Sequence, residues 1–262
     1  MSEINSKAGE YSLKNAWIVS FIRIPLLFIM LVMVFLVVKT FGVETDFPFL
    51  PDLSTVYFTV VNIICFFLLH RIVQKEGRTI FELLDFDPKR LGKDILHGFL
   101  WLFVLYIPFV IAVMGTMFIM YGSDFIDHFG TVFAGDVEDG AFSRPRSLMW
   151  FAACISFIFP FLNAPIEELM YRGYAQPLFI KKYKKVWIGI LIPSVGFAIQ
   201  HIMLAASLQG AIVYTAAFFV WGIGSGIIFH KQKRLFPLIV CHFIVNIAFS
   251  VLPILFLLLG VY

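Results

Sequence analysis

Two adjacent carboxylates and an arginine lie inside an apolar part of the chain, in residues 163–173. Charged side chains at membrane depth cost roughly 2.5–3.5 kcal/mol each on insertion scales, so they usually mark a functional site. On a helix, Glu168 and Arg172 are four residues apart with the acid first, the favourable order for an ion pair. Glu167 is rotated by about 100° from Glu168, and no neighbouring residue neutralises it. We therefore predict that Arg172 pairs with Glu168 and leaves Glu167 free to act.

Three further polar residues, His201, His242 and Asn246, lie inside later apolar runs. His242 and Asn246 are four residues apart and share one face of a helix. From the rise per residue, Glu167 and His201 lie ~21 Å and ~22 Å from the basic ends of their runs, so they can meet at a similar depth. His242 lies only ~12 Å beyond Arg234, so its helix must tilt, start deeper or be broken.

The residue types allow three kinds of chemistry. In the first, Glu167 is the general base of a hydrolysis, a histidine shares the proton, and a histidine–asparagine pair stabilises the oxyanion. In the second, Glu167, His201 and His242 are ligands of a catalytic metal. In the third, the same groups form a proton or ion relay in a transporter. Each polar residue alone could be a packing residue, but burying all of them without a function is expensive.

The composition is that of an integral membrane protein, because 60% of the 262 residues are hydrophobic and only 14% are charged. We predict an all-α, polytopic transmembrane bundle with about seven spans, or eight if the last run is broken at Pro253. The formal charge of +3 gives no indication of nucleic-acid binding. The apolar runs, each long enough for ~30 Å of hydrocarbon, cover residues 16–38, 55–73, 95–121, 147–181, 186–206, 211–229 and 235–259.

Basic residues cluster on every second loop, which orients the chain. The positive-inside rule predicts a cytoplasmic N-terminus and a multi-pass protein of the cytoplasmic membrane, in contact with the lipid bilayer. The acidic segment of residues 122–146 is expected to be a solvated connector. The basic loops are residues 71–93, 181–185 and 231–234.

Some polar and helix-breaking residues are given plainer interpretations. Arg23, near the start of the first run, is expected to extend its side chain to the lipid headgroups. Asn62 is expected to be an interfacial or packing residue. The fourth run is too long for a simple span, so we expect a kink at Pro160 or Pro165 and an interfacial segment from Leu169 onward.

Three motifs resemble those of the CPBP family of intramembrane proteases, named for CAAX prenyl proteases and bacteriocin-processing enzymes and also called the Abi family. EExxxR occurs at residues 167–172, FxxxH at residues 197–201 and HxxxN at residues 242–246. Each motif alone is weak, but the three in order, each in its own apolar run, make a specific match. The resemblance covers residues 147–250, whereas the first ~145 residues are similar only in being hydrophobic spans.

The resemblance implies a glutamate-dependent intramembrane endopeptidase. By this resemblance, Glu167 and His201 activate water, and His242 with Asn246 forms the oxyanion site. The substrate would be a peptide or a membrane-protein segment. The alternative from another class is a peptide or ion transporter, or an immunity protein that does not cut, with a buried glutamate–histidine relay.

The same resemblance assigns supporting roles and an organisation. Glu168 and Arg172 would be structural or orienting residues, and Phe197 would pack beside the site. No cofactor and no metal are expected, with a metalloprotease as the lesser option. We predict one integral membrane domain, in which residues 1–146 form N-terminal helices and loops and residues 147–262 form the catalytic core. The site should be a water-filled cavity among the fourth, fifth and last helices of a bacterial membrane protein.

Overall fold

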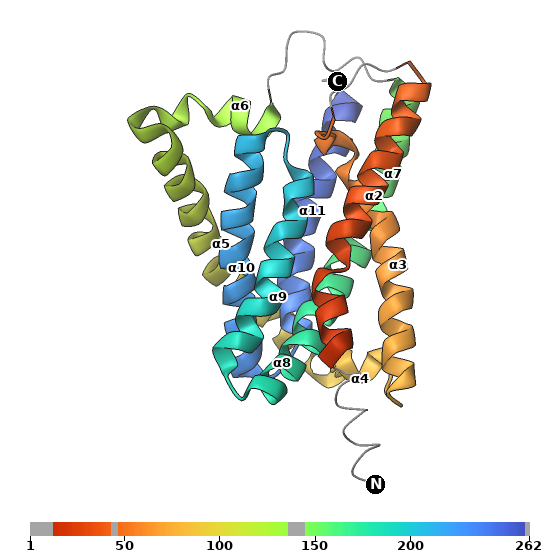
Figure 1. Ribbon diagram of the computed structural model, residues 1–262, viewed down its shortest axis with the longest axis vertical. Coiled ribbons are helices and arrows are strands. Elements are labelled where there is room, and N and C mark those ends of the chain that lie inside the picture. The colour runs from red at the N-terminus through yellow and green to blue at the C-terminus, as the bar shows by residue number, and fades with distance from the viewer. Residues whose placement is uncertain (1–12, 43–46, 136–144, 260–262) are drawn as a thin grey trace.

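The computed structural model describes residues 13–42, 47–135 and 145–259, and no strand occurs among them. Their helices lie side by side in an elongated bundle (Figure 1), so the predicted all-α polytopic architecture is confirmed. The helices are α2 (Arg23–Thr40), α3 (Ser54–Lys75), α4 (Ile80–Leu84), α5 (Leu91–Tyr121), α6 (Phe129–Ala134), α7 (Arg146–Glu168), α8 (Gln176–Tyr183), α9 (Val186–Gln200), α10 (Leu208–Gln232) and α11 (Phe236–Leu259).

Six helical stretches among the described residues are long and apolar enough to cross a membrane. They correspond in order to the first six predicted runs, and α11 corresponds to the seventh. Because α11 is one continuous helix, the last run is not a broken pair. The six stretches are Leu13–Thr40, Pro51–Lys75, Ile80–Ile126, Arg146–Tyr183, Val186–Leu204 and Leu208–Gln232.

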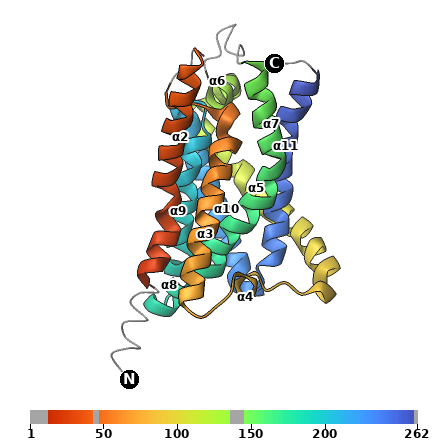
Figure 2. The same ribbon diagram turned by 90° about the vertical axis from the view of Figure 1, so that its right-hand side faces the viewer.

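The order of neighbours around the bundle places α7 between α3 and α11, while α9 contacts α2 and α10, and α5 contacts α10 and α11. Figure 2 shows α2, α3, α7 and α11 next to one another. The short helices α4 and α8 lie at the lower end of the bundle in both views, and α6 lies at the upper end. The part of the acidic segment that forms α6 packs its Val132 against Met117 and Val213, so it is not a solvated connector there.

The end of α7 carries the acidic residues into the interior. Asn163 and Glu167 are four residues apart and are both buried on one face of α7, which also contains Pro160 and Pro165. The chain then widens into a π-helical turn, Leu169–Ala175, a local irregularity that is frequent at functional sites. The predicted interfacial position of this segment is wrong, because nearly all its side chains are buried in the core.

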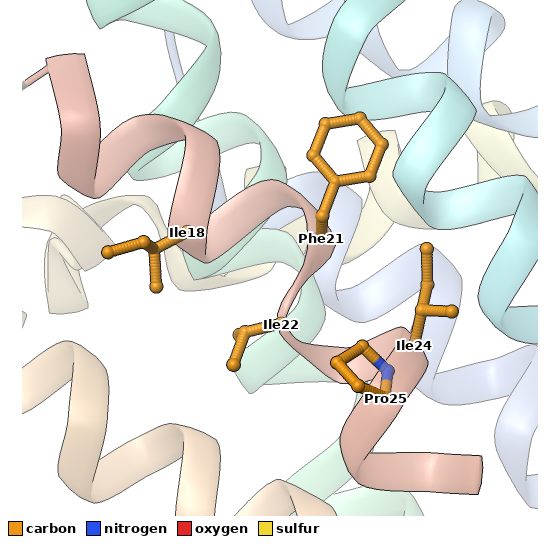
Figure 3. A pocket seen from close by; sticks show the side chains of 5 residues that line it. All are labelled: Ile18, Phe21, Ile22, Ile24 and Pro25. Carbon is orange, nitrogen blue, oxygen red and sulfur yellow. The ribbon is translucent and has the colours of Figure 1, made fainter.

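The first span is locally irregular at Ile22, between a helical segment, residues 13–21, and α2, although Ile22 itself keeps helical backbone angles. Pro25 has no amide hydrogen to donate, which removes one helical hydrogen bond at this point. The side chain of Arg23 is fully buried, whereas its neighbours line a shallow apolar hollow of about 400 Å³ (Figure 3). The lining residues are Ile18, Phe21, Ile22, Ile24 and Pro25.

Two glycines allow close helix contacts near this point. A Cβ atom on Gly196 of α9 would lie 1.9 Å from the carbonyl oxygen of Ser20, so the first span approaches α9 backbone to backbone. A Cβ atom on Gly222 of α10 would lie 3.0 Å from the Cβ atom of Ser194 in α9. The first contact holds the segment before α2 against α9, and the second holds α10 against α9.

Candidate active site

The predicted ion pair between Glu168 and Arg172 is present. Nη1 of Arg172 lies 3.3 Å from Oε1 of Glu168, and both side chains are almost fully buried. Nη2 of Arg172 donates a 3.3 Å hydrogen bond to the carbonyl oxygen of Gly222, and the guanidinium lies 4.5 Å from the centroid of the Phe197 ring. Arg172 therefore connects the end of α7 to both α9 and α10.

Glu167 also has a cationic partner, contrary to the prediction. Nη2 of Arg23 lies 2.7 Å from Oε1 of Glu167, and both side chains are 0% exposed. The expectation that Arg23 extends to the headgroups is therefore wrong, because its side chain is fully buried and points into the bundle toward Glu167. Local spacing could not predict the pair, since its members are 144 positions apart.

A cluster of buried amides completes the surroundings of Arg23. Its Nε atom donates to Oε1 of Gln200 at 2.5 Å, and its Nη1 atom donates to Oδ1 of Asn62 at 2.6 Å. Its Nη2 atom also donates to Oδ1 of Asn163 at 3.3 Å, while Nε2 of Gln200 donates to Oε1 of Glu167 at 3.0 Å. Sequence reasoning missed these amides, although a polar residue inside an apolar run was the signal that identified His201.

His242 of α11 lies between the two glutamates. Its Nδ1 atom is 3.0 Å from Oε1 of Glu168, and its Nε2 atom is 3.6 Å from Oε2 of Glu167. Because a carboxylate only accepts, Nδ1 carries a hydrogen and donates it to Glu168. Both ring nitrogens thus face a carboxylate oxygen, and α11 reaches this depth without a break.

Several buried polar atoms here have no hydrogen-bond partner among the described protein groups. They include Oε2 of Glu167, Oε2 of Glu168, the Tyr171 hydroxyl and Nδ2 of Asn246. Asn246 lies one turn beyond His242 on α11. Buried polar groups in native proteins are nearly always hydrogen-bonded, so this concentration of unpaired atoms indicates a functional centre.

His201 begins a short 3₁₀ turn, His201–Leu204, that follows α9. Its Nδ1 atom donates to the carbonyl oxygen of Phe197 at 2.6 Å, which leaves Nε2 as an acceptor. The ring stacks on Phe218 with centroids 3.6 Å apart, and Phe197 packs beside both His201 and His242, at 4.6 Å and 6.1 Å. In the described part of the chain, no hydrogen bond joins His201 to Glu167.

Residues 146–248 match the family model of type II CAAX prenyl endopeptidase, Rce1-like proteins. This segment, which is less than half of the chain, is similar to that family. The family resemblance predicted from the three motifs is thereby confirmed, and the Rce1-like segment contains every predicted site residue. It supports a protease of the CAAX type that acts within the membrane. No curated protein and no solved structure matches the chain.

Three of the four side chains that accept hydrogen bonds from Arg23 lie in the Rce1-like segment: Asn163, Glu167 and Gln200. Arg23 itself and its fourth partner, Asn62, lie outside it. The centre is therefore composite: a polar network on α2 and α3 is joined to acids and histidines of the matched segment. The sequence match alone does not identify that contribution.

The centre is enclosed. The side chains of Glu167, His201 and His242 are at most 5% exposed, and neither of the two hollows found in the bundle is lined by a predicted site residue. The predicted water-filled cavity is thus not one of these hollows. Among the described residues, no group of three or more His, Cys, Asp or Glu side chains is arranged to hold a metal ion.

Proposed function

We propose that the protein is an intramembrane endopeptidase of the glutamic type, with Glu167 as the base that activates water. One observation carries this proposal. Oε1 of Glu167 accepts hydrogen bonds from Arg23 and Gln200, whereas the buried Oε2 has no hydrogen-bond partner and lies 3.6 Å from Nε2 of His242. A carboxylate oxygen held in this way is available to take a proton.

In the proposed reaction one proton is transferred, and the carbon–nitrogen bond of the peptide is replaced by a carbon–oxygen bond to water. The water oxygen bonds to the carbonyl carbon of the peptide while its proton passes to Oε2 of Glu167. The carbon–nitrogen bond then breaks, and the proton passes to the leaving amine. A water molecule between Glu167 and His201 would serve as the nucleophile. Oε2 of Glu167 would accept one hydrogen bond from this water, and Nε2 of His201 would accept the other.

The oxyanion would be stabilised by His242 and Asn246. The buried Nδ2 of Asn246 is a donor without a hydrogen-bond partner, which is what an oxyanion site needs before substrate binds. His242, whose Nδ1 donates to Glu168 and whose Nε2 lies 3.6 Å from Oε2 of Glu167, would be the second group beside the oxyanion. Glu168 and Arg172 orient His242 in this proposal, and Phe197 separates it from His201.

The proposed substrate is a peptide or a membrane-protein segment, cut by a catalytic core of residues 147–262. The proposed location is the cytoplasmic membrane, with the end that carries α4 and α8 in the cytoplasm. Support comes from basic residues beside these two helices, namely Arg78 before α4 and Lys184 and Lys185 after α8. Both helices lie at the lower end of the bundle in Figures 1 and 2. Labelling of Lys184→Cys by an impermeant thiol reagent only in inverted vesicles would support this orientation, and labelling in intact cells would contradict it.

The test compares new peptide termini in membranes that contain the wild-type protein or a variant, with and without a chelator. Glu167→Gln should abolish the termini that the wild type generates, and Glu167→Asp, which keeps the charge beside Arg23, should strongly reduce them. Glu82→Gln makes the same chemical change on the exposed face of α4 and should leave every product in place.

Each outcome separates the candidate functions. Products that need Glu167 and resist the chelator support the glutamic protease. Products that a chelator abolishes would indicate a metalloprotease. Identical termini in all membranes, with every variant well folded, would contradict proteolysis and favour the transporter or immunity protein.

A further inference from the structure

We infer that Arg23, on the first membrane span, is a positioning residue for Glu167 in the proposed cleavage reaction. The inference rests on the proposed function and adds a residue outside the Rce1-like segment to the catalytic machinery. It starts from the 2.7 Å contact between Nη2 of Arg23 and Oε1 of Glu167, in which both side chains are 0% exposed.

The surroundings of Arg23 are built for a planar cation. Three amide oxygens and one carboxylate oxygen, from three different helices, accept hydrogen bonds from all three guanidinium nitrogens. The forked guanidinium of arginine matches such a set, whereas a lysine ammonium would satisfy only part of it. The acceptors belong to Asn62 of α3, Asn163 and Glu167 of α7, and Gln200 of α9.

This arrangement fixes the orientation of the Glu167 carboxylate. Arg23 and Gln200 both donate to Oε1, and Gln200 in turn accepts from Arg23, so the three side chains form a closed ring of hydrogen bonds. Rotation of the carboxylate would break this ring. As a result, Oε2 keeps its direction toward Nε2 of His242.

Arg23 also completes the charge balance of the centre. The two adjacent carboxylates face two arginines, and Arg172 is engaged by Glu168 and by the carbonyl oxygen of Gly222. Of the Lys and Arg side chains in the described part of the chain, Arg23 alone pairs with Glu167. Without Arg23, the Glu167 carboxylate would lie beside Glu168 with no cation to compensate its charge. The Glu167 side chain would also lose the hydrogen bond that fixes its orientation.

The test measures the rate at which new peptide termini form in membranes, counting only termini that the Glu167→Gln variant does not produce. Each rate is divided by the amount of folded protein. Arg23→Met should lower this rate by about 100-fold, which is the loss expected from a misplacement of about 1 Å. Arg23→Lys should recover part of the rate because it restores the charge. Asn62→Ala leaves Arg23 in place but removes one acceptor, and it should lower the rate several-fold.

The matched control is Arg234→Gln, which breaks a different interhelical ion pair, with Asp94 and Asp85. It should lower thermal stability and leave the rate per folded molecule unchanged. If Arg23→Met does not fold, Arg23→Lys and Asn62→Ala carry the test. Wild-type rates in these variants, with Glu167→Gln inactive, would overturn this inference alone. Absence of any termini that depend on Glu167 in the wild type would overturn the proposed function itself.

Discussion

Nε2 of His242 lies 3.6 Å from Oε2 of Glu167, while its Nδ1 atom lies 3.0 Å from Oε1 of Glu168. One imidazole ring therefore lies next to both Glu167 and Glu168. The two acids nevertheless have different surroundings. Glu168 is held by Arg172 and orients the ring, as a carboxylate commonly does for a histidine. Glu167 is held by Arg23 on one oxygen and presents the other.

This relationship predicts the effect of His242→Phe. Phenylalanine keeps a ring of similar size but has no nitrogen to donate or accept, so cleavage should fall by about 100-fold or more, as after loss of an oxyanion donor. The rate of product formation in membranes checks this prediction. The neighbouring Phe243→Leu, at a position that contacts Phe161, should be nearly neutral. A His242→Phe rate within twofold of wild type would remove this residue from the mechanism.

Because Arg23 and Glu167 form an ion pair, we expect the effects of mutating them on the free energy of unfolding to be coupled. From the sequence alone, Glu167→Gln should leave stability nearly unchanged, because no partner is visible. The structure predicts a loss of about 3–5 kcal/mol, since the variant strands a buried guanidinium. The double variant Arg23→Met, Glu167→Gln should recover much of that loss but no activity. Unfolding measurements on the four proteins give the coupling energy, and additive losses would show that the pair does not interact.

Arg172→Ala should destabilise the protein by a similar amount, about 3–5 kcal/mol, because it leaves Glu168 buried beside His242 without its cation. Arg172→Lys keeps the charge but cannot reproduce both the Glu168 contact and the hydrogen bond to Gly222, so its loss should be smaller. Thermal unfolding of the purified variants checks the order. An unaltered melting temperature for Arg172→Ala would refute a structural role for this ion pair.

Gly196→Ala tests the approach of the first span to α9. The added methyl would lie 1.9 Å from the Ser20 carbonyl oxygen, so the helices must separate, at a cost of about 1–3 kcal/mol. Cleavage should fall as well, because the separation shifts Arg23 relative to Glu167. Gly115→Ala on α5 meets nothing within 4 Å and should be neutral or slightly stabilising. Equal behaviour of the two variants would contradict the close contact.

Arg234 distinguishes a buried acid from an exposed one. It pairs with Asp94, which is 1% exposed, and with Asp85, which is 54% exposed at a distance of 3.1 Å. Asp94→Asn should cost several kcal/mol because it breaks the buried contact, whereas Asp85→Asn should cost less than about 1 kcal/mol. Comparable losses in chemical unfolding would contradict this assignment.

The same arginine predicts how stability responds to alkaline pH. Hydrogen bonding to Asp94 raises the pKa of Arg234. A group whose pKa is raised by folding contributes stability that persists below its unfolded pKa and is lost only as pH rises through the folded pKa. The contribution of Arg234, measured as the difference between wild type and Arg234→Gln, should therefore stay constant from about pH 7 to pH 10.

The features with a local or periodic pattern could be predicted from the sequence. The lengths of the apolar runs predicted the membrane spans, and the four-residue spacing predicted the Glu168–Arg172 ion pair. The role of Arg23 could not be predicted, because an arginine near the start of an apolar run has the same pattern whether it points outward or inward. The acceptors that hold Arg23 inside the bundle come from α3, α7 and α9 and lie far from it in the sequence, so no local pattern shows them.

The long sequence separation of Arg23 and Glu167 has a consequence for biosynthesis. The arginine enters the membrane on the first span, and its partner follows 144 residues later. At about 5–20 residues per second, roughly 7–30 s pass before Glu167 leaves the ribosome. Until then Arg23 has no Glu167 carboxylate to pair with, and an unpaired charge at membrane depth costs roughly 2.5–3.5 kcal/mol on insertion scales. The Arg23–Glu167 contact can form only after α7 has been synthesised, so it is a late step in assembly.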